Sequence, residues 1–401
     1  MEQRSILDFL KKPDSARSAS SRPQQSRSGP YRRNNINARE HYSSSKYRAP
    51  DRRRNMSLRL VADETKEVLP DIRAGLPSEF DVEWSCLESL DHPDSAPLPV
   101  ECCPALMTPC IIRVLNMDSF DAAIQLDPSH TVRQHVTKKR LNTNKENGKP
   151  AIDLNVKTDT PMEDVATPEK VEEKGQQPEV KTQESEIKKQ PKDATTSEKV
   201  TPVAVLNLAS ERSPGGGWQK GALAQEECLC YRSSLYLSLD RKFYPIPTLS
   251  AIYSPNVVLI RESMSNGHKL LIGVQSHDLP AVSVISVAAL RLPDLSDDGK
   301  TFGNPGARCH TKKNIRLILR VAARHGHRKL VLGALGCGVF GNPPRDVANC
   351  FLEVFREAEF QGGWWEKIVF AVLDNVNGPD GGKDGKGNFG QFYQVLNGQV
   401  V

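Results

Sequence analysis

The sequence has 401 residues, which is enough for one or two domains and additional unfolded segments. Apolar residues make up 38% of the chain and charged residues 26%, and there are 28 prolines. Because globular chains are roughly 45–50% apolar, this composition excludes a single compact globule over the full length. The net charge of +5 is too small to indicate a nucleic-acid binder, so direct nucleic-acid binding is not expected.

No apolar run reaches the roughly 18 residues of a membrane span, and the first residues lack the apolar core of a signal peptide. We therefore expect a soluble intracellular protein without a membrane partner. The nine cysteines follow no disulfide or CxxC spacing, and no HExxH motif is present. This pattern predicts reduced thiols, no structural zinc and no metal or other cofactor.

Two segments have the composition of disordered chain. Residues 1–55 are rich in Ser, Arg, Gln and Pro, and residues 134–201 are rich in Lys, Glu, Thr and Pro without aromatic residues. Neither can bury enough apolar area to offset the entropy lost on ordering. The folded part is then predicted to consist of residues 56–133, a helical part with a first strand and helix, and 202–401, the larger core.

Strands and helices alternate within the folded part. In chain order, the hydrophobic periodicity predicts a helix at 57–72, a strand at 111–115, a helix at 117–126, a strand at 203–209, a helix at 222–239, strands at 257–260 and 282–289, a helix at 312–326, a strand at 329–335, a helix at 343–360 and a strand at 367–374. This alternation predicts an α/β fold in which helices cover both faces of a sheet.

A first glycine loop, Gly215-Gly216-Gly217, follows the strand at 203–209 and precedes Gln225-Glu226-Glu227. Successive glycines let a ligand approach the backbone amides closely, although glycines also mark plain surface turns. The loop follows a buried strand, and open α/β sheets bind ligands at the carboxyl ends of their strands. The two glutamates favour acid–base chemistry beside this loop, or alternatively an acidic first turn favoured by the helix dipole.

A second glycine loop, Gly336-Cys337-Gly338-Val339-Phe340-Gly341, follows the strand at 329–335. It matches the pattern G-x-G-x-x-G, which leaves open a nicotinamide dinucleotide oxidoreductase. That fingerprint belongs to the first strand–helix turn of its domain, whereas this loop lies late in the chain. Backbone amides at the start of a helix also suit a diphosphate, which is the interpretation we prefer.

The three glycines, seven further residues and Gln-Glu-Glu together resemble the signature of microbial-type poly(ADP-ribose) glycohydrolases. The segments VLNLASERSPGGGW, GALAQEECLCYRSSLY and LVLGALGCGVFGNPP resemble the family in order and spacing over most of 202–374. The resemblance implies a macrodomain-like three-layer mixed sheet with an N-terminal helical extension. It also implies hydrolysis of the ribose–ribose O-glycosidic bond of poly(ADP-ribose), which releases ADP-ribose without a metal.

The resemblance further implies roles for single residues. Glu227 would be the general acid and base, Glu226 and Asn207 would hold ribose hydroxyls, and Gln225 would fix the geometry of the pair. The first loop would line the diphosphate and the scissile ribose. In the second loop, Gly336, Cys337, Gly338 and Val339 would bind phosphate, and Phe340 would pack against the distal ribose. Acid catalysis near neutral pH requires a raised carboxyl pKa, which we expect from partial burial.

Residues 3–10 resemble the box by which replication and repair proteins bind the sliding clamp PCNA. Gln3, Ile6 and Phe9 occupy its positions, and Leu10 replaces the second aromatic residue. Basic runs at 52–54 and 138–140 are compatible with nuclear import, so we expect a nuclear protein with a role in the DNA damage response, with the cytoplasm as a further location.

Two other functions remain open for a domain of this kind. One is a reader that binds ADP-ribose without cutting it, and the other is an enzyme that removes single ADP-ribose groups from proteins. The glutamate pair beside the glycine loop favours the glycohydrolase over the reader, which has no need of it. Whether cleavage occurs at chain ends or internally does not follow from the sequence.

Overall fold

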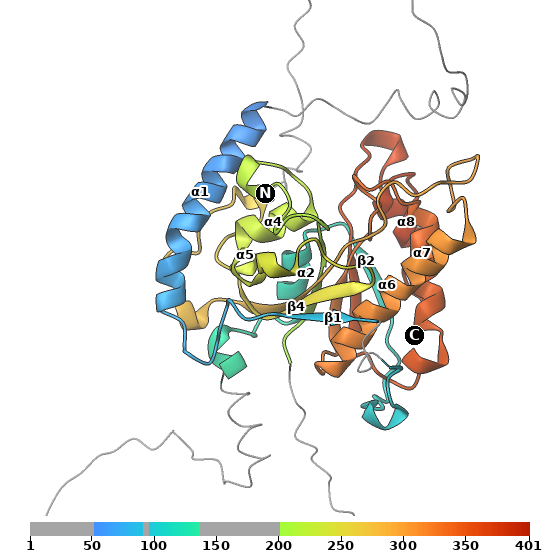
Figure 1. The fold of residues 1–401 in the computed structure, drawn as a ribbon, viewed down its shortest axis with the longest axis horizontal. Coiled ribbons are helices and arrows are strands. Elements are labelled where there is room, and N and C mark those ends of the chain that lie inside the picture. Colours follow the sequence, from blue (N-terminus) through green and yellow to red (C-terminus); the bar gives the residue numbers. More distant parts are fainter. Residues whose placement is uncertain (1–51, 91–95, 137–200) are drawn as a thin grey trace, which may run out of the picture. The chain divides into compact units, whose positions relative to one another are not determined.

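The computed structural model describes residues 52–90, 96–136 and 201–401 (Figure 1). The clamp-binding-like segment at 3–10 and nearly all of the predicted insertion lie outside them. The described helices and strands are α1 (Arg52–Ala74), β1 (Cys86–Ser89), β2 (Ile112–Leu115), α2 (Ser119–Leu126), β3 (Ala204–Leu208), α4 (Gln225–Arg232), α5 (Leu235–Ser238), β4 (Ser250–Val258), β5 (Ala281–Val287), α6 (Pro305–Arg324), β6 (Lys329–Leu332), α7 (Pro344–Phe355), β7 (Lys367–Ala371) and α8 (Asn388–Leu396).

The described strands form one seven-stranded mixed sheet in the order β1-β4-β5-β3-β6-β7-β2. The five strands from β5 to β2 run parallel, and β4 is antiparallel to both of its neighbours. The central strand β3 lies between β5 and β6. Because these three strands are parallel, the loops that follow them emerge at the same edge of the sheet.

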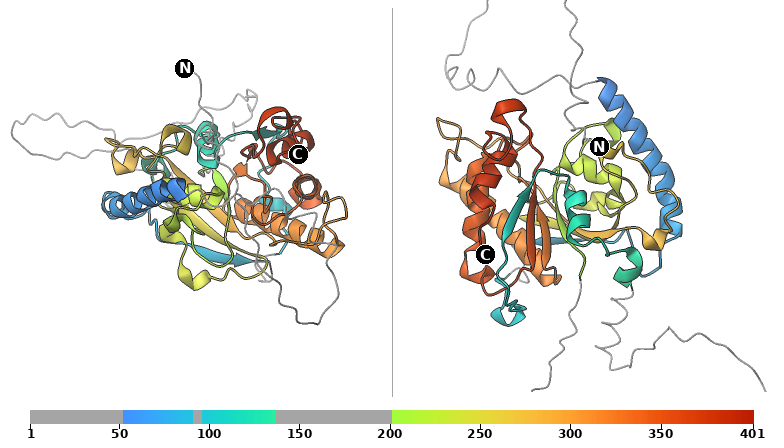
Figure 2. Two further views of the ribbon diagram at one scale, coloured as in Figure 1. Left: turned by 90° about the horizontal axis from the view of Figure 1, so that it is seen from above. Right: turned by 180° about the vertical axis from the view of Figure 1, so that it is seen from behind.

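Helices cover both faces of the sheet (Figures 1 and 2). Helices α6, α7 and α8 lie on one face, and α1, α2, α4 and α5 lie on the other. The strands, buried on both faces, supply alternate residues to the two cores. In β3, for example, Leu206 belongs to the core with α6 and α7, and Val205 belongs to the core with α4. The predicted three-layer α/β fold with an N-terminal helix is confirmed.

Several predicted boundaries were wrong. Residues 52–55 belong to the first turn of α1 rather than to the disordered tail, and residues 134–136 are helical, with Val136 buried in a small core under α1. Among the described elements, β1 and α8 were missed, and β4 begins at Ser250 rather than at 257. The tail and insertion were therefore assigned a few residues too many.

The predicted helix at 222–239 is divided in two at Ser233. This residue is extended (φ −151°, ψ 177°) and forms an isolated bridge with Leu259. Immediately before it, the buried Arg232 pairs with Asp118 and Asp121 at the start of α2. These tertiary contacts override the local helical pattern, and α4 ends just after the residues of the proposed site. Within the described residues, no helix has the length and apolar character needed to cross a membrane.

Candidate functional site

The first glycine loop connects β3 to α4 and lies against the carboxyl groups of α4. Gly215 and Gly216 have positive φ angles of 66° and 59°, which L side chains rarely adopt. A Cβ atom on Gly216 would lie 2.5 Å from Oε1 of Glu227 and 3.0 Å from Oε2 of Glu226. Glycine is thus required at this position, and both carboxylates reach the same point of the loop. A Cβ atom on Gly217 would lie 2.8 Å from Cβ of Ala222.

Gln225 fastens the start of α4 to β3. Its Oε1 accepts a hydrogen bond from the backbone N–H of Leu208 (2.9 Å), and its Nε2 donates to the carbonyl of Leu206 (2.8 Å) and to Ser119 (3.2 Å). The pairing of β3 with β6 ends at Val205, so the Gln225 carboxamide forms hydrogen bonds with backbone groups of β3 that lie beyond the end of that pairing. Gln225 therefore fixes the position of the two glutamates relative to the strand.

Glu226 is almost fully buried, and both of its oxygens accept hydrogen bonds. Oε2 accepts from the backbone N–H of Ser210 (2.8 Å), and Oε1 accepts from Nδ2 of Asn207 (3.4 Å). Burial raises the pKa of Glu226 to about 8, and the negative charge of Glu227 adds to the increase, while these hydrogen bonds oppose it. The raised pKa that we expected of the acid thus occurs at the first glutamate of the pair.

Asn207 lies fully buried on β3 beside Glu226. Its Nδ2 also donates to the hydroxyl of Ser286 on β5 (3.0 Å). Its Oδ1 has no hydrogen-bond partner among the described residues. A buried acceptor without a partner costs about 1–3 kcal/mol, so this atom is suited to receive a hydroxyl group of a ligand.

Glu227 has one oxygen bound to the loop and one available. Its Oε1 accepts a hydrogen bond from the backbone N–H of Gly217 (2.9 Å). No described residue donates to its Oε2. The residue is 9% exposed, compared with 3% for Glu226. Of the two carboxyl groups, Glu227 therefore has the free oxygen and the more open position that proton transfer to a ligand requires.

The second glycine loop follows β6 and is braced by Asn342. The Nδ2 of Asn342 lies 2.7 Å from the carbonyl of Leu290 and 3.1 Å from that of Gly336. Gly336 has a φ of 73°, and a Cβ there would lie 2.4 Å from the Asn342 amide, whereas Gly338 has open space around it. Cys337 is buried, and Val339 is 57% exposed. The loop thus has a rigid base and an accessible tip.

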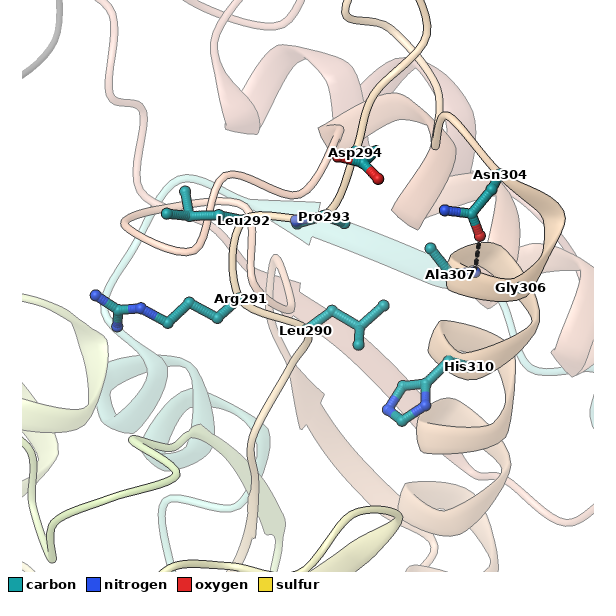
Figure 3. Close-up of a pocket in the computed structure, with 9 residues that line it drawn as sticks. All are labelled: Leu290, Arg291, Leu292, Pro293, Asp294, Asn304, Gly306, Ala307 and His310. Carbon is teal, nitrogen blue, oxygen red and sulfur yellow. Dashed lines mark hydrogen bonds between the residues drawn. The ribbon is translucent and has the colours of Figure 1, made fainter. Parts of the chain in front are cut away.

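Phe340 in this loop packs under an arginine from the chain after β5. The guanidinium of Arg291 lies 5.3 Å from the centre of the Phe340 ring. No described residue forms an ion pair or hydrogen bond with that guanidinium. In Figure 3 the Arg291 side chain extends away from α6. It therefore offers a cation at the edge of the second loop.

A cavity of about 340 Å³ lies on the other side of Arg291, between residues 290–294 and the start of α6 (Figure 3). Its lining includes Leu290, Asp294 and His310, but neither glutamate and neither glycine loop. We therefore place the candidate active site at the two loops, where the carboxyl pair and the backbone amides lie, and not in this cavity.

The structure brings the predicted residues to one edge of the sheet. Asn207 and the first loop follow from β3, and the second loop follows from its parallel neighbour β6. Three contributors were not predicted: Ser286 and Ser210, which bind Asn207 and Glu226, and Asn342. The Pro343-Pro344 pair, which sets the start of α7 just after Asn342, was the available signal for a fixed loop end.

These features define a macrodomain-like α/β domain in which a carboxyl pair lies against one glycine loop and a second glycine loop follows the neighbouring parallel strand. Residues 130–262 match the family model of the microbial-type PARG catalytic domain, a span that includes the first loop and both glutamates. Over these residues the chain thus matches the family that its motifs predicted. No curated protein matched the chain when the sequences were compared.

Several solved structures are also similar to this chain. The poly(ADP-ribose) glycohydrolase (PARG) of Thermomonospora curvata is 25% identical, with a TM-score of 0.53, and the match covers 85% of this chain and 99% of that one. The same enzyme bound to the inhibitor ADP-HPD is 24% identical, with a TM-score of 0.51, and the match covers 84% and 99%. PARG from Deinococcus radiodurans in complex with ADP-ribose is also similar, at 24% identity, with coverage of 82% and 97% and a TM-score of 0.49.

Proposed function

We propose that the protein is a poly(ADP-ribose) glycohydrolase and that Glu227 is its general acid and base. The observation that carries the proposal is that Oε2 of Glu227 accepts no hydrogen bond from the described residues and lies beside a loop in which only glycine fits at position 216. A reader of ADP-ribose has no need of a buried carboxyl pair at this point. The family assignment agrees with hydrolysis.

In the reaction, Glu227 gives its proton to the oxygen that joins the two riboses. The bond between that oxygen and C1 of the distal ribose then breaks, and positive charge develops on the ribose ring. The resulting Glu227 carboxylate removes a proton from water, whose oxygen attacks C1. The diphosphate of the substrate supplies negative charge near this centre, so this scheme needs no metal.

Glu226 holds a proton at the site near neutral pH. In the free protein the raised pKa places the proton on Glu226. A ribose hydroxyl that donates to Glu226 favours its charged form, so substrate binding favours release of this proton. The unpartnered Oδ1 of Asn207 accepts from a second hydroxyl of the same ribose. Substrate binding thus releases a proton beside the residue that acts as the acid.

The test compares wild type with Glu227→Gln and Glu226→Gln, and uses Glu211→Gln, at a partly exposed position, as control. Release of ADP-ribose from auto-modified poly(ADP-ribose) polymerase measures hydrolysis, and calorimetry measures ADP-ribose binding. We expect Glu227→Gln to bind ADP-ribose but to lose about 10²–10⁴-fold in rate, and Glu211→Gln to behave as wild type. A Glu227→Gln variant that still cuts at the wild-type rate would refute the acid assignment.

The same assay separates the two alternative functions. A wild-type protein that binds ADP-ribose but releases none is a reader. A protein that removes only the last ADP-ribose attached to the modified enzyme, and leaves the polymer intact, is a mono-ADP-ribosyl hydrolase. Polymer of defined length as substrate distinguishes release from the ends from internal cleavage.

The proposal extends to a nuclear location and to PCNA as a partner through residues 3–10. Its support is the sequence of that segment, with Gln3, Ile6 and Phe9 at the positions of the clamp-binding box and the neighbouring Leu10 at the second aromatic position. A fluorescent peptide of residues 1–14 is expected to bind the clamp, with Phe9→Ala as control. No change in anisotropy at high micromolar clamp would remove this partner.

A further inference from the structure

Three side chains with metal-binding atoms meet far from the glycine loops. Cys86 and Glu88 lie on β1, and His325 follows the last residue of α6. The thiol sulfur, one carboxylate oxygen and one imidazole nitrogen all lie within 4.8 Å of one another. Successive strand residues point to opposite faces, so residues 86 and 88 share the face toward α6.

The surrounding contacts hold these groups in place. Nε2 of His325 lies 2.5 Å from Oε1 of Glu88. The His325 ring stacks on Tyr253 of β4, with 3.7 Å between ring centres and 16° between ring planes. Cys86 pairs with the same Tyr253 in the β1–β4 ladder. Two adjacent strands and the end of one helix therefore determine the arrangement.

The donor set suits zinc better than a hard cation. Thiolate, imidazole and carboxylate are the three kinds of ligand that bind Zn²⁺, whereas Mg²⁺ and Ca²⁺ prefer oxygen alone. Glu88 and His325 are 18% and 30% exposed and Cys86 is partly buried, so a metal ion and a fourth ligand from water can reach the cluster.

Although the cysteine spacing predicted no structural zinc, we propose that Cys86, Glu88 and His325 bind a Zn²⁺ ion that joins the edge strand β1 to the end of α6. On binding, the Cys86 thiol releases its proton to solvent, and the metal replaces the direct contact between Glu88 and His325. Among the described strands, β1 pairs only with β4, so this site adds a second attachment for the edge strand. Hydrolysis does not depend on it, because His325 lies before the amino end of β6 and the glutamate pair lies at the carboxyl ends.

The experiment uses the full chain, reduced and stripped of metal by a chelator. Zinc is titrated against a chromophoric competitor, and cobalt is titrated separately to detect the thiolate-to-cobalt charge-transfer absorption. We expect one tight equivalent of zinc, a thiolate absorption with cobalt, and a melting temperature that increases with zinc. Cys86→Ser and His325→Gln are expected to bind at least about 100-fold more weakly and to lose the increase, since each removes one of three ligands.

The exposed Cys102 provides the matched control, and Cys102→Ser is expected to bind as wild type does. Circular dichroism establishes that each variant is folded before titration. A wild type that binds no zinc, or a Cys86→Ser variant that binds it as tightly as wild type, would overturn the proposal. Hydrolysis of polymer by the metal-free protein is measured in parallel, so a failure of this site and a failure of the proposed function are distinguishable.

Discussion

Replacing Glu226 by glutamine removes the buried carboxyl whose pKa is raised. Because that pKa is about 8 in the folded protein and near 4.5 in the unfolded chain, the folded state binds the extra proton between these values. The unfolded state binds fewer protons in this range, so the contribution to stability is present at low pH and is lost as the pH increases toward 8. Two pKa values separated in this way predict a loss of about 2 kcal/mol between pH 6 and pH 8.

Glutamine is a close substitute for the protonated acid at this position. The side-chain oxygen of glutamine can accept a hydrogen bond from the Ser210 N–H or from Asn207. Its NH₂ group then takes the place of the O–H group of the protonated acid and faces the other of these two donors. We therefore expect Glu226→Gln to resemble protonated wild type at every pH. The variant is expected to be about as stable as wild type at pH 6 and about 2 kcal/mol more stable at pH 8.

Urea unfolding at pH 6, 7 and 8 measures the difference between the two proteins at each pH. Other titrating groups are common to both proteins and cancel in that difference. Glu227→Gln removes the negative charge that adds to the raised pKa, so it is expected to make the pH dependence shallower. If the difference between wild type and Glu226→Gln is the same at all three pH values, Glu226 is not protonated in the free protein and our account of how substrate binding releases its proton is wrong.

Four further substitutions test the loops and the residues beside them. Gly338→Ala places a methyl group in open space, so we expect it to keep stability within about 0.5 kcal/mol of wild type while it weakens ADP-ribose binding. Gly336 has a positive φ and a Cβ there would make a 2.4 Å contact, so we expect Gly336→Ala to cost more than about 2 kcal/mol in thermal unfolding. Equal affinities of Gly338→Ala and wild type for ADP-ribose would contradict a phosphate-binding loop. Gln225→Ala leaves two strand groups unpaired and is expected to cost about 2–4 kcal/mol in urea unfolding, a result that a near-zero change would exclude. Arg291→Ala is expected to raise KM for polymer more than it weakens ADP-ribose binding, and to reduce the dependence of KM on salt concentration. An unchanged KM would show that Arg291 does not bind polymer.

The sequence was most informative where local pattern and tertiary structure agree. Apolar runs predicted β3, β5 and β6, and the glycine loops and the glutamate pair were placed correctly after their strands. It did not predict β1, whose four residues are half-buried and lack an apolar pattern, nor the division of the helix at Ser233. The helical pattern of residues 222–239 contains no information on distant contacts. Here the ion pairs of Arg232 with residues at the start of α2 override that pattern.

The site itself combines residues that only the fold brings together. Ser286 lies far from Asn207 in the sequence, yet the parallel register of β3 and β5 places them side by side. The raised pKa of Glu226 likewise depends on burial under several segments, so a motif can name the carboxyl but not its protonation. What a sequence reports is the kind of group; which group holds the proton is decided by packing.

The same reasoning predicts that residues 140–198 can be removed without loss of hydrolysis. The strand β2 before them and the strand β3 after them belong to one sheet, and α2 is one of the helices that cover it. None of the site residues described lies in the deleted stretch. Each doubling of a flexible loop costs only about 0.6 kcal/mol, so a shorter connection changes stability little as long as it spans the two ends. The deletion variant, joined by a short Gly-Ser linker, is expected to unfold within about 1 kcal/mol of wild type and to release ADP-ribose at the wild-type rate. A folded deletion variant that binds ADP-ribose but no longer cuts polymer would show that these residues take part in catalysis.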